Sequence, residues 1–86
     1  MSKYHVVRKP HGFMKPYIAV NGHLPKRELP ERMRGMHRNT VYIDADIHKR
    51  NPARERRILL HEYREMHQFE SHPGMSYRKA HRRVGY

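Results

Sequence analysis

The chain has 86 residues, of which 36% are hydrophobic, so it has room for one domain with a small core. It contains no cysteine, which excludes disulfides and thiolate zinc sites and leaves a metal held by histidine and carboxylate as the remaining cross-link. The formal net charge of +11 attracts polyanions, so the basic side chains indicate either a nucleic-acid partner or a solubilising surface.

Proline and glycine interrupt the first forty residues repeatedly, so the elements there must be short. Residues 4–8 and 17–20 are predicted strands, because both are rich in β-branched and aromatic side chains. Asn21-Gly22 predicts a tight hairpin turn after the second strand, and Pro25 limits any returning strand to two residues. Residues 29–36 are expected to form one or two helical turns.

The signals are clearer from residue 39 onward. Residues 40–44 form the best strand candidate, and residues 44–50 are predicted to form an acidic and polar loop. Asn51-Pro52 has both parts of a helix start, a capping side chain and a proline at the first helical position. The helix should extend to residue 69 or 70, and a second helix should begin at Ser76 and continue through residue 84.

These elements predict a single α+β domain over residues 1–86. Residues 1–38 would supply Pro/Gly-rich strands and turns, and residues 39–86 a strand, a metal-binding helix and a C-terminal helix. The expected architecture is a small N-terminal sheet packed on a long active-site helix, closed by the short C-terminal helix.

The long predicted helix has acidic residues on its apolar side. At about 100° per residue, one broad face collects five apolar side chains, namely Ile58, Leu59, Tyr63, Met66 and Phe69. Glu62 falls inside this face, and Glu65 lies on its border beside His61. Burial of carboxylates is costly, so such an exception to the helical pattern is typical of a functional site.

The spacing of these side chains indicates a metal site. His61 and Glu65 are four residues apart, so they lie one helical turn from each other and can bind one ion. Glu62 is placed to act as a general base, as in the metalloprotease motif. The third ligand is expected to be His81, on the inward face of the second helix, and His72 is a candidate fourth ligand. Nitrogen and oxygen donors in this number favour zinc over calcium or magnesium.

The chain resembles small zincin-like proteins of archaea and their viruses, which are related in shape to minimal metallopeptidases. The residues that carry the resemblance lie between about 39 and 84: Val41-Tyr42-Ile43-Asp44, Ile58-Leu59-Leu60-His61-Glu62 with Glu65, Gly74-Met75-Ser76-Tyr77, and Ala80-His81. The resemblance implies zinc bound on the long helix beneath a strand that lines the cleft. His61 then matches the first histidine of the family's HExxH motif and Glu62 its catalytic glutamate. Position 65 departs from that motif, because it holds glutamate where the family has histidine.

Three functions remain open from the sequence. The first is a zinc hydrolase, most simply a peptidase, in which residues 40–44 pair with an extended peptide or protein substrate and a tyrosine stabilises the oxyanion. The tyrosines considered for that role are Tyr63, Tyr77 and Tyr86.

The second is a zinc-stabilised, non-catalytic module that binds nucleic acid through basic residues of the last helix, namely Arg78, Lys79, Arg82 and Arg83. The third is a metal-free basic domain in which Glu62 and Glu65 pair with arginines, the candidates being Arg57, Arg64 and Arg78. No apolar run is long enough to span a bilayer and residues 1–5 lack a signal-peptide pattern, so we expect a cytoplasmic protein with no membrane partner.

Overall fold

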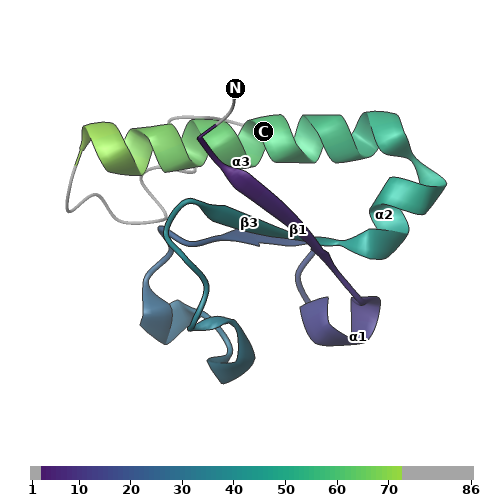
Figure 1. Ribbon diagram of the computed structural model, residues 1–86, viewed down its shortest axis with the longest axis horizontal. Coiled ribbons are helices and arrows are strands. Elements are labelled where there is room, and N and C mark those ends of the chain that lie inside the picture. Colours follow the sequence, from purple (N-terminus) through teal and green to yellow (C-terminus); the bar gives the residue numbers. More distant parts are fainter. Residues whose placement is uncertain (1–2, 73–86) are drawn as a thin grey trace.

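The computed structural model describes residues 3–72, which form a small α+β fold (Figure 1). In chain order the elements are β1 (His5–Lys9), α1 (His11–Met14), β2 (Ala19–Asn21), the 3-10 turns η1 (Lys26–Glu28) and η2 (Glu31–Met33), β3 (Thr40–Asp44), α2 (Ala45–Arg50) and α3 (Pro52–Ser71). The predicted fold class is therefore confirmed, and the predicted helix from Ser76 lies outside the described residues. Among the residues described, no helix combines the length and the apolar character needed to cross a membrane.

The three strands form one sheet in the order β1-β3-β2. β1 runs parallel to β3, with His5 opposite Thr40, whereas β2 runs antiparallel to β3, with Asn21 opposite Val41. The strand predicted with most support, β3, is thus the central strand, and both of its edges are occupied.

The predicted hairpin at Asn21-Gly22 is wrong. After β2 the chain stays beside β3, because the Gly22 N–H donates to the Thr40 carbonyl at 2.9 Å, and it then passes through η1 and η2. Gly22 is needed for close approach, since a Cβ atom there would lie 2.0 Å from the backbone oxygen of His37. The glycine therefore lets two backbone segments touch, and the turn from Asn21 to Leu24 leads toward η1 instead of a returning strand.

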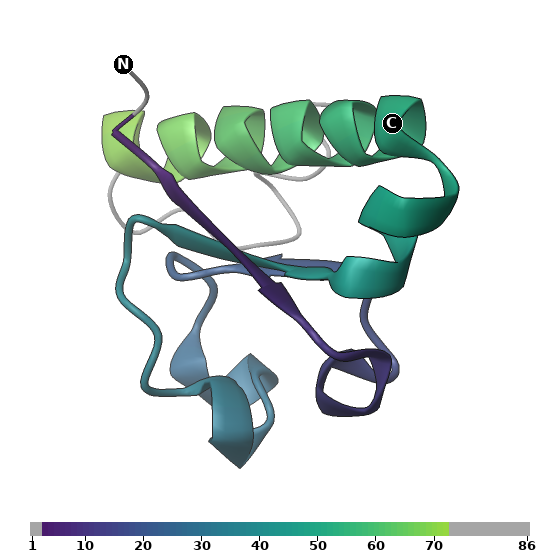
Figure 2. The ribbon, with the colours of Figure 1, turned by 45° about the vertical axis from the view of Figure 1, so that its right-hand side comes forward.

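The two faces of the sheet are covered by different layers. Figures 1 and 2 show α3 across one face, and α1 with the segment between β2 and β3 on the other side. The second layer encloses a buried cluster of apolar side chains, made up of Met14, Val20, Leu29, Met33 and Met36. The helical turns expected over residues 29–36 are present here only as the single turn η2.

The acidic loop predicted for residues 44–50 is a helix instead. The side chain of Asp44 accepts a hydrogen bond from the backbone N–H of Asp46, so the last residue of β3 is also the N-cap of α2. An aspartate at this position satisfies one of the free N–H groups at a helix start, which explains why a polar segment becomes helical.

The long helix α3 begins as predicted. The Asn51 side chain accepts from the Arg54 N–H at 3.0 Å, and Pro52 occupies the first turn. The helix ends at Ser71, one or two residues beyond the predicted end. Its position over the sheet sets the geometry of the candidate site.

Candidate functional site

The inner face of α3 is unusually polar for a helix that covers a sheet. Its buried residues are Glu55, Ile58, His61, Glu62, Glu65 and Met66, so four of the six side chains are polar or ionisable. The sequence-based expectation that carboxylates intrude on the apolar face is confirmed.

His61 and Glu65 are in direct contact within this interface. The Nε2 atom of His61 lies 2.5 Å from the Oε2 atom of Glu65, and their side chains are only 9% and 1% exposed. The spacing of four residues brings the imidazole and the carboxylate onto the same strip of the helix, as expected. The structure therefore brings together the two ligands that α3 was predicted to provide.

A residue of the sheet holds the side chain of Glu62 in place. Its Oε2 atom accepts a hydrogen bond of 2.7 Å from Nδ2 of Asn21, at the end of β2, and both residues are buried. Asn21 in turn receives a hydrogen bond from the backbone N–H of His23 on its side-chain oxygen, which fixes the orientation of the amide. The sequence showed no role for Asn21 beyond a turn, because its partner is 41 residues away.

The chemistry of the His61 and Glu65 pair fits a transition-metal ion. Two ligand atoms about 2.0–2.1 Å from one tetrahedral zinc lie about 3.3 Å apart, so the two atoms need to separate by less than about 1 Å to share an ion. Rotation about the side-chain torsions of a glutamate accommodates a change of this size. A nitrogen donor and an oxygen donor are both ordinary zinc ligands.

The other predicted ligands are either outside the described residues or too far away. His81, the expected third ligand, lies outside the described residues, as do Tyr77, Tyr86 and the basic residues of the last predicted helix. His72 is the exposed C-cap of α3, eleven residues beyond His61, which corresponds to about 16 Å along the helix axis. It is therefore not a ligand of this site.

Two further expectations are corrected by the fold. β3 cannot pair with an extended peptide, since β1 and β2 occupy both of its edges. The ring of Tyr63 stacks on that of Tyr4, with centroids 5.2 Å apart, and burial raises the pKa of the Tyr63 phenol. Tyr63 is thus used in packing. The ion pairs among residues 3–72 do not include Arg57 or Arg64, and Arg78, the third arginine considered as a partner of Glu62 and Glu65, lies outside the described residues.

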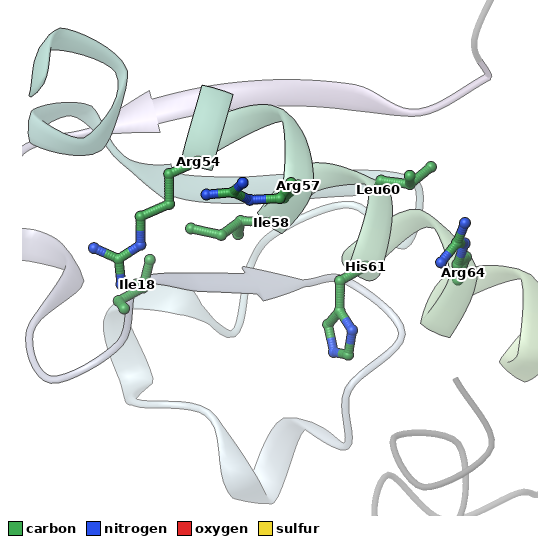
Figure 3. A pocket seen from close by; sticks show the side chains of 7 residues that line it. All are labelled: Ile18, Arg54, Arg57, Ile58, Leu60, His61 and Arg64. Carbon is green, nitrogen blue, oxygen red and sulfur yellow. The ribbon is translucent and has the colours of Figure 1, made fainter. Parts of the chain in front are cut away.

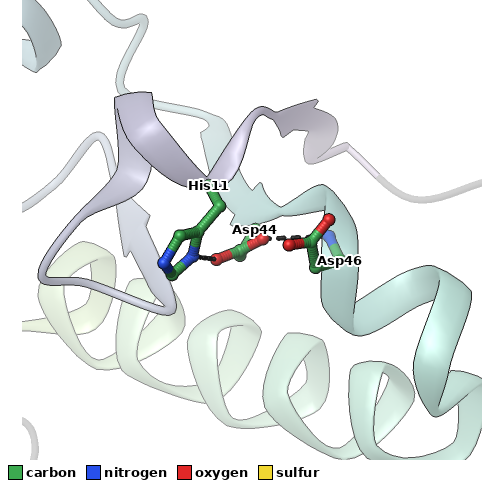
Figure 4. Close-up of side chains that lie close together, drawn as sticks. All are labelled: His11, Asp44 and Asp46. Carbon is green, nitrogen blue, oxygen red and sulfur yellow. Dashed lines mark hydrogen bonds and ion pairs between the residues drawn. The ribbon is translucent and has the colours of Figure 1, made fainter.

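A second group that could hold a metal ion lies at the other end of the sheet (Figure 4). It comprises His11, Asp44 and Asp46, whose ligand atoms all lie within 4.8 Å of one another. Sequence reasoning missed it because His11 is 33 residues from Asp44, although two aspartates separated by one residue after a strand were a local signal.

Asp44 already has a structural role in this group. Its Oδ2 atom lies 2.6 Å from Nδ1 of His11, and its Oδ1 atom caps α2. Burial alone would raise the pKa of Asp44, but the hydrogen bonds from His11 and from the Asp46 N–H outweigh it and the pKa is lowered. The group can therefore be explained as a capped helix start with an attached histidine.

A pocket of about 430 Å³ opens beside His61 (Figure 3). Its lining combines apolar and basic side chains and contains no carboxylate; the residues are Ile18, Arg54, Arg57, Ile58, Leu60, His61 and Arg64. In Figure 3, Arg54 and Arg57 lie toward one end of the pocket and Arg64 toward the other, with His61 between them. A ligand in this pocket would contact the buried imidazole.

Comparison with protein-family models, with curated proteins and with solved structures found no match for this chain.

Proposed function

We propose that the protein is a zincin-like, metal-dependent hydrolase in which α3 holds zinc through His61 and Glu65, with His81 as third ligand. The observation that carries the proposal is the buried contact of 2.5 Å between Nε2 of His61 and Oε2 of Glu65. The resemblance of residues 39–84 to zincin-like proteins supports the same assignment. A metal here would also strengthen a small domain that has no disulfide.

Each residue of the site has a distinct task under this proposal. Held by His61 and Glu65, a zinc ion would supply Lewis-acid polarisation of the bond to be hydrolysed. Glu62 follows His61 in the helix, but its side chain leaves the helix in a different direction. It can therefore accept the proton that the attacking water releases without being a ligand of the metal. Asn21 holds the Glu62 carboxylate through the 2.7 Å hydrogen bond and so limits its rotation. The pocket would bring a substrate to His61, the one residue of the site that lines it.

Metal analysis of the purified protein tests this proposal. The protein is prepared without a histidine tag, and the number of zinc ions per chain is measured by elemental mass spectrometry. We expect about one zinc per chain in the wild type, with most of it lost in His61→Ala and in Glu65→Gln. His11→Ala is the matched control, because it removes a histidine from the other candidate group.

The outcomes of the metal analysis are distinct. Retention of zinc in His11→Ala together with its loss in His61→Ala supports the site on α3. Loss of zinc only in His11→Ala would place the ion at the His11, Asp44 and Asp46 group and reject the proposal. A wild-type protein that binds no zinc would reject it as well.

The role of Glu62 is tested separately with Glu62→Gln. The amide cannot accept a proton but preserves the size of the side chain. We expect the zinc content to stay at about one per chain while hydrolysis falls by about 10²–10⁴-fold, the usual contribution of a general base. Unchanged turnover in Glu62→Gln would show that Glu62 has only a structural role.

A further inference from the structure

The pocket beside His61 has an unusual combination of charge and exposed apolar surface. The described residues with large, exposed hydrophobic side chains are Val7, Ile18 and Leu60, and the last two line this pocket, at 42% and 49% exposure. Apolar side chains left in solvent at the rim of a cavity indicate contact with a ligand.

The basic side chains of the pocket are available to a ligand. Arg54, Arg57 and Arg64 are exposed, and none of them belongs to an ion pair among residues 3–72. Some other arginines of the described chain do contribute to the fold: Arg8 pairs with Glu55, and Arg32 donates to the Phe13 carbonyl. The three pocket arginines therefore carry charge that the fold itself does not neutralise.

The position of Arg54 is unfavourable for the helix. Arg54 lies in the first turn of α3, where the helix dipole is positive and a basic side chain is disfavoured. The same dipole attracts an anion, so the start of α3 and the guanidinium of Arg54 would act together on a negatively charged ligand. A residue that opposes the stability of its helix while lining a pocket is expected at a binding site.

The length of the basic strip indicates more than one anionic group. Arg54 and Arg64 are ten residues apart on α3, which corresponds to about 15 Å along the helix axis. Figure 3 places these two arginines toward opposite ends of the pocket. A single phosphate or carboxylate cannot contact both ends, whereas an extended chain of anions can.

We infer that this pocket binds the phosphodiester backbone of a single-stranded nucleic acid, with Arg54, Arg57 and Arg64 on phosphates and Ile18, Ile58 and Leu60 against sugar and base. Phosphates separated by sugars and bases match a lining in which the apolar side chains of Ile58 and Leu60 lie between Arg57 and Arg64 along α3. The net charge of +11 favours the same class of ligand. The inference depends on the proposed function in one respect. If the protein is a hydrolase that holds zinc at His61, the bound strand would be its substrate, because the strand would lie beside His61.

The test is binding of a fluorescein-labelled 12-nucleotide single strand, as DNA and as RNA, measured by fluorescence anisotropy over a range of salt concentrations. The test variant carries Arg54→Gln, Arg57→Gln and Arg64→Gln together. The matched control carries Arg27→Gln, Lys49→Gln and Arg56→Gln, which removes the same charge from exposed positions outside the pocket lining. Circular dichroism confirms that both variants are folded.

We expect the pocket variant to bind at least about tenfold more weakly than the control at 100 mM salt. The slope of log K against log salt should decrease in magnitude by about 2, since each lost phosphate contact on a single strand contributes about 0.7. The control variant should retain most of the wild-type slope.

Two results would overturn the inference. Equal losses in the pocket and control variants would mean that binding uses the whole basic surface. Equal or tighter binding of a labelled polyglutamate of matched charge would mean that the pocket recognises carboxylates. Zinc is measured in the same samples, so that the two proposals can fail separately. If the nucleic acid binds through the pocket but the protein contains no zinc, the inference stands and the proposed metal site is rejected. If the protein contains zinc but the pocket variant binds as the control does, the metal site stands and the inference is rejected.

Discussion

Three carboxylates are buried along α3, and their surroundings differ residue by residue. Glu55 accepts two hydrogen bonds from Arg8 of β1 and lies 2.8 Å from Nδ1 of His48. Glu62 accepts from a neutral amide, and Glu65 contacts an imidazole. A guanidinium that donates two hydrogen bonds is a strong partner for a buried carboxylate. Glu55 therefore links β1 to α3, Glu62 links α3 to β2 through Asn21, and Glu65 contacts His61 within the helix.

The structural role of Glu55 predicts a pH-dependent loss of stability in Glu55→Gln. The Arg8 hydrogen bonds lower the pKa of Glu55 from its ordinary value of 4.5, with burial acting in the opposite direction and His48 adding to the lowering. A lowered pKa in the folded state stabilises the fold above pH 4.5, and this stabilisation is lost as the pH falls through the folded value. We expect the variant to be less stable than the wild type by about 1–2 kcal/mol at pH 7. The loss is limited because Arg8 is partly exposed, so that solvent screens its interaction with Glu55.

Urea denaturation between pH 3 and pH 7 measures this difference. It should shrink as the pH falls below about 4.5, because the Glu55 carboxylate is then protonated first in the unfolded chain and, at still lower pH, in the folded protein. Glu28→Gln is the control, since Glu28 is exposed. A difference that stays constant across this range would contradict the assigned ion pair.

At the scale of elements, the junction between α2 and α3 depends on one residue. The backbone N–H of Asn51 donates to the Ile47 carbonyl and ends α2, while the Asn51 side chain caps the first turn of α3. The two helices are in contact with each other through this junction, so the direction of α3 over the sheet depends on it. Because α3 carries the candidate site, the cap acts on the site through the orientation of the helix.

Removal of this cap should destabilise the whole domain. Asn51→Ala deletes the side-chain acceptor and leaves the backbone bond intact, so we expect a loss of about 1 kcal/mol. For a domain of this size that corresponds to about 4–8 °C in the melting temperature, measured by circular dichroism. Asn51→Asp keeps an acceptor beside the positive end of the helix and should melt close to the wild type. Equal melting of the Ala and Asp variants would disprove the capping role.

At the scale of the whole molecule, the net charge of +11 opposes folding. The carboxylates in the ion pairs of residues 3–72 are few, namely Asp44, Glu55, Glu65 and Glu70, so most basic side chains repel one another. Charges separated by more than about 10 Å are screened at 0.1 M salt. Salt should therefore relieve this repulsion more than it weakens the few surface pairs.

We thus expect sodium chloride to stabilise the protein. Raising it from 20 to 500 mM should increase the melting temperature by about 4–8 °C, equivalent to about 1 kcal/mol in a domain of this size. Differential scanning fluorimetry measures the shift, with sodium sulfate at equal ionic strength as a comparison for specific anion binding. A fall in melting temperature with sodium chloride would mean that surface ion pairs dominate the electrostatics.

The sequence by itself determined the parts of the protein that depend on near neighbours. The β-branched run at 40–44 and the Asn51-Pro52 start are local signals, and both elements appear where they were predicted. The burial of Glu62 and Glu65 also followed from the helical repeat alone. In such cases one turn of helix or one strand contains all the groups that decide the outcome.

The tertiary structure alone decided which distant groups meet. Three features join segments about 20 to 40 residues apart: the central place of β3, the hydrogen bond from Asn21 to Glu62, and the shared pocket lined by Ile18 and arginines of α3. The approach of His11 to Asp44 is of the same kind. Such contacts depend on how the sheet and α3 pack together, and the spacing of residues along the chain does not determine which strands become neighbours.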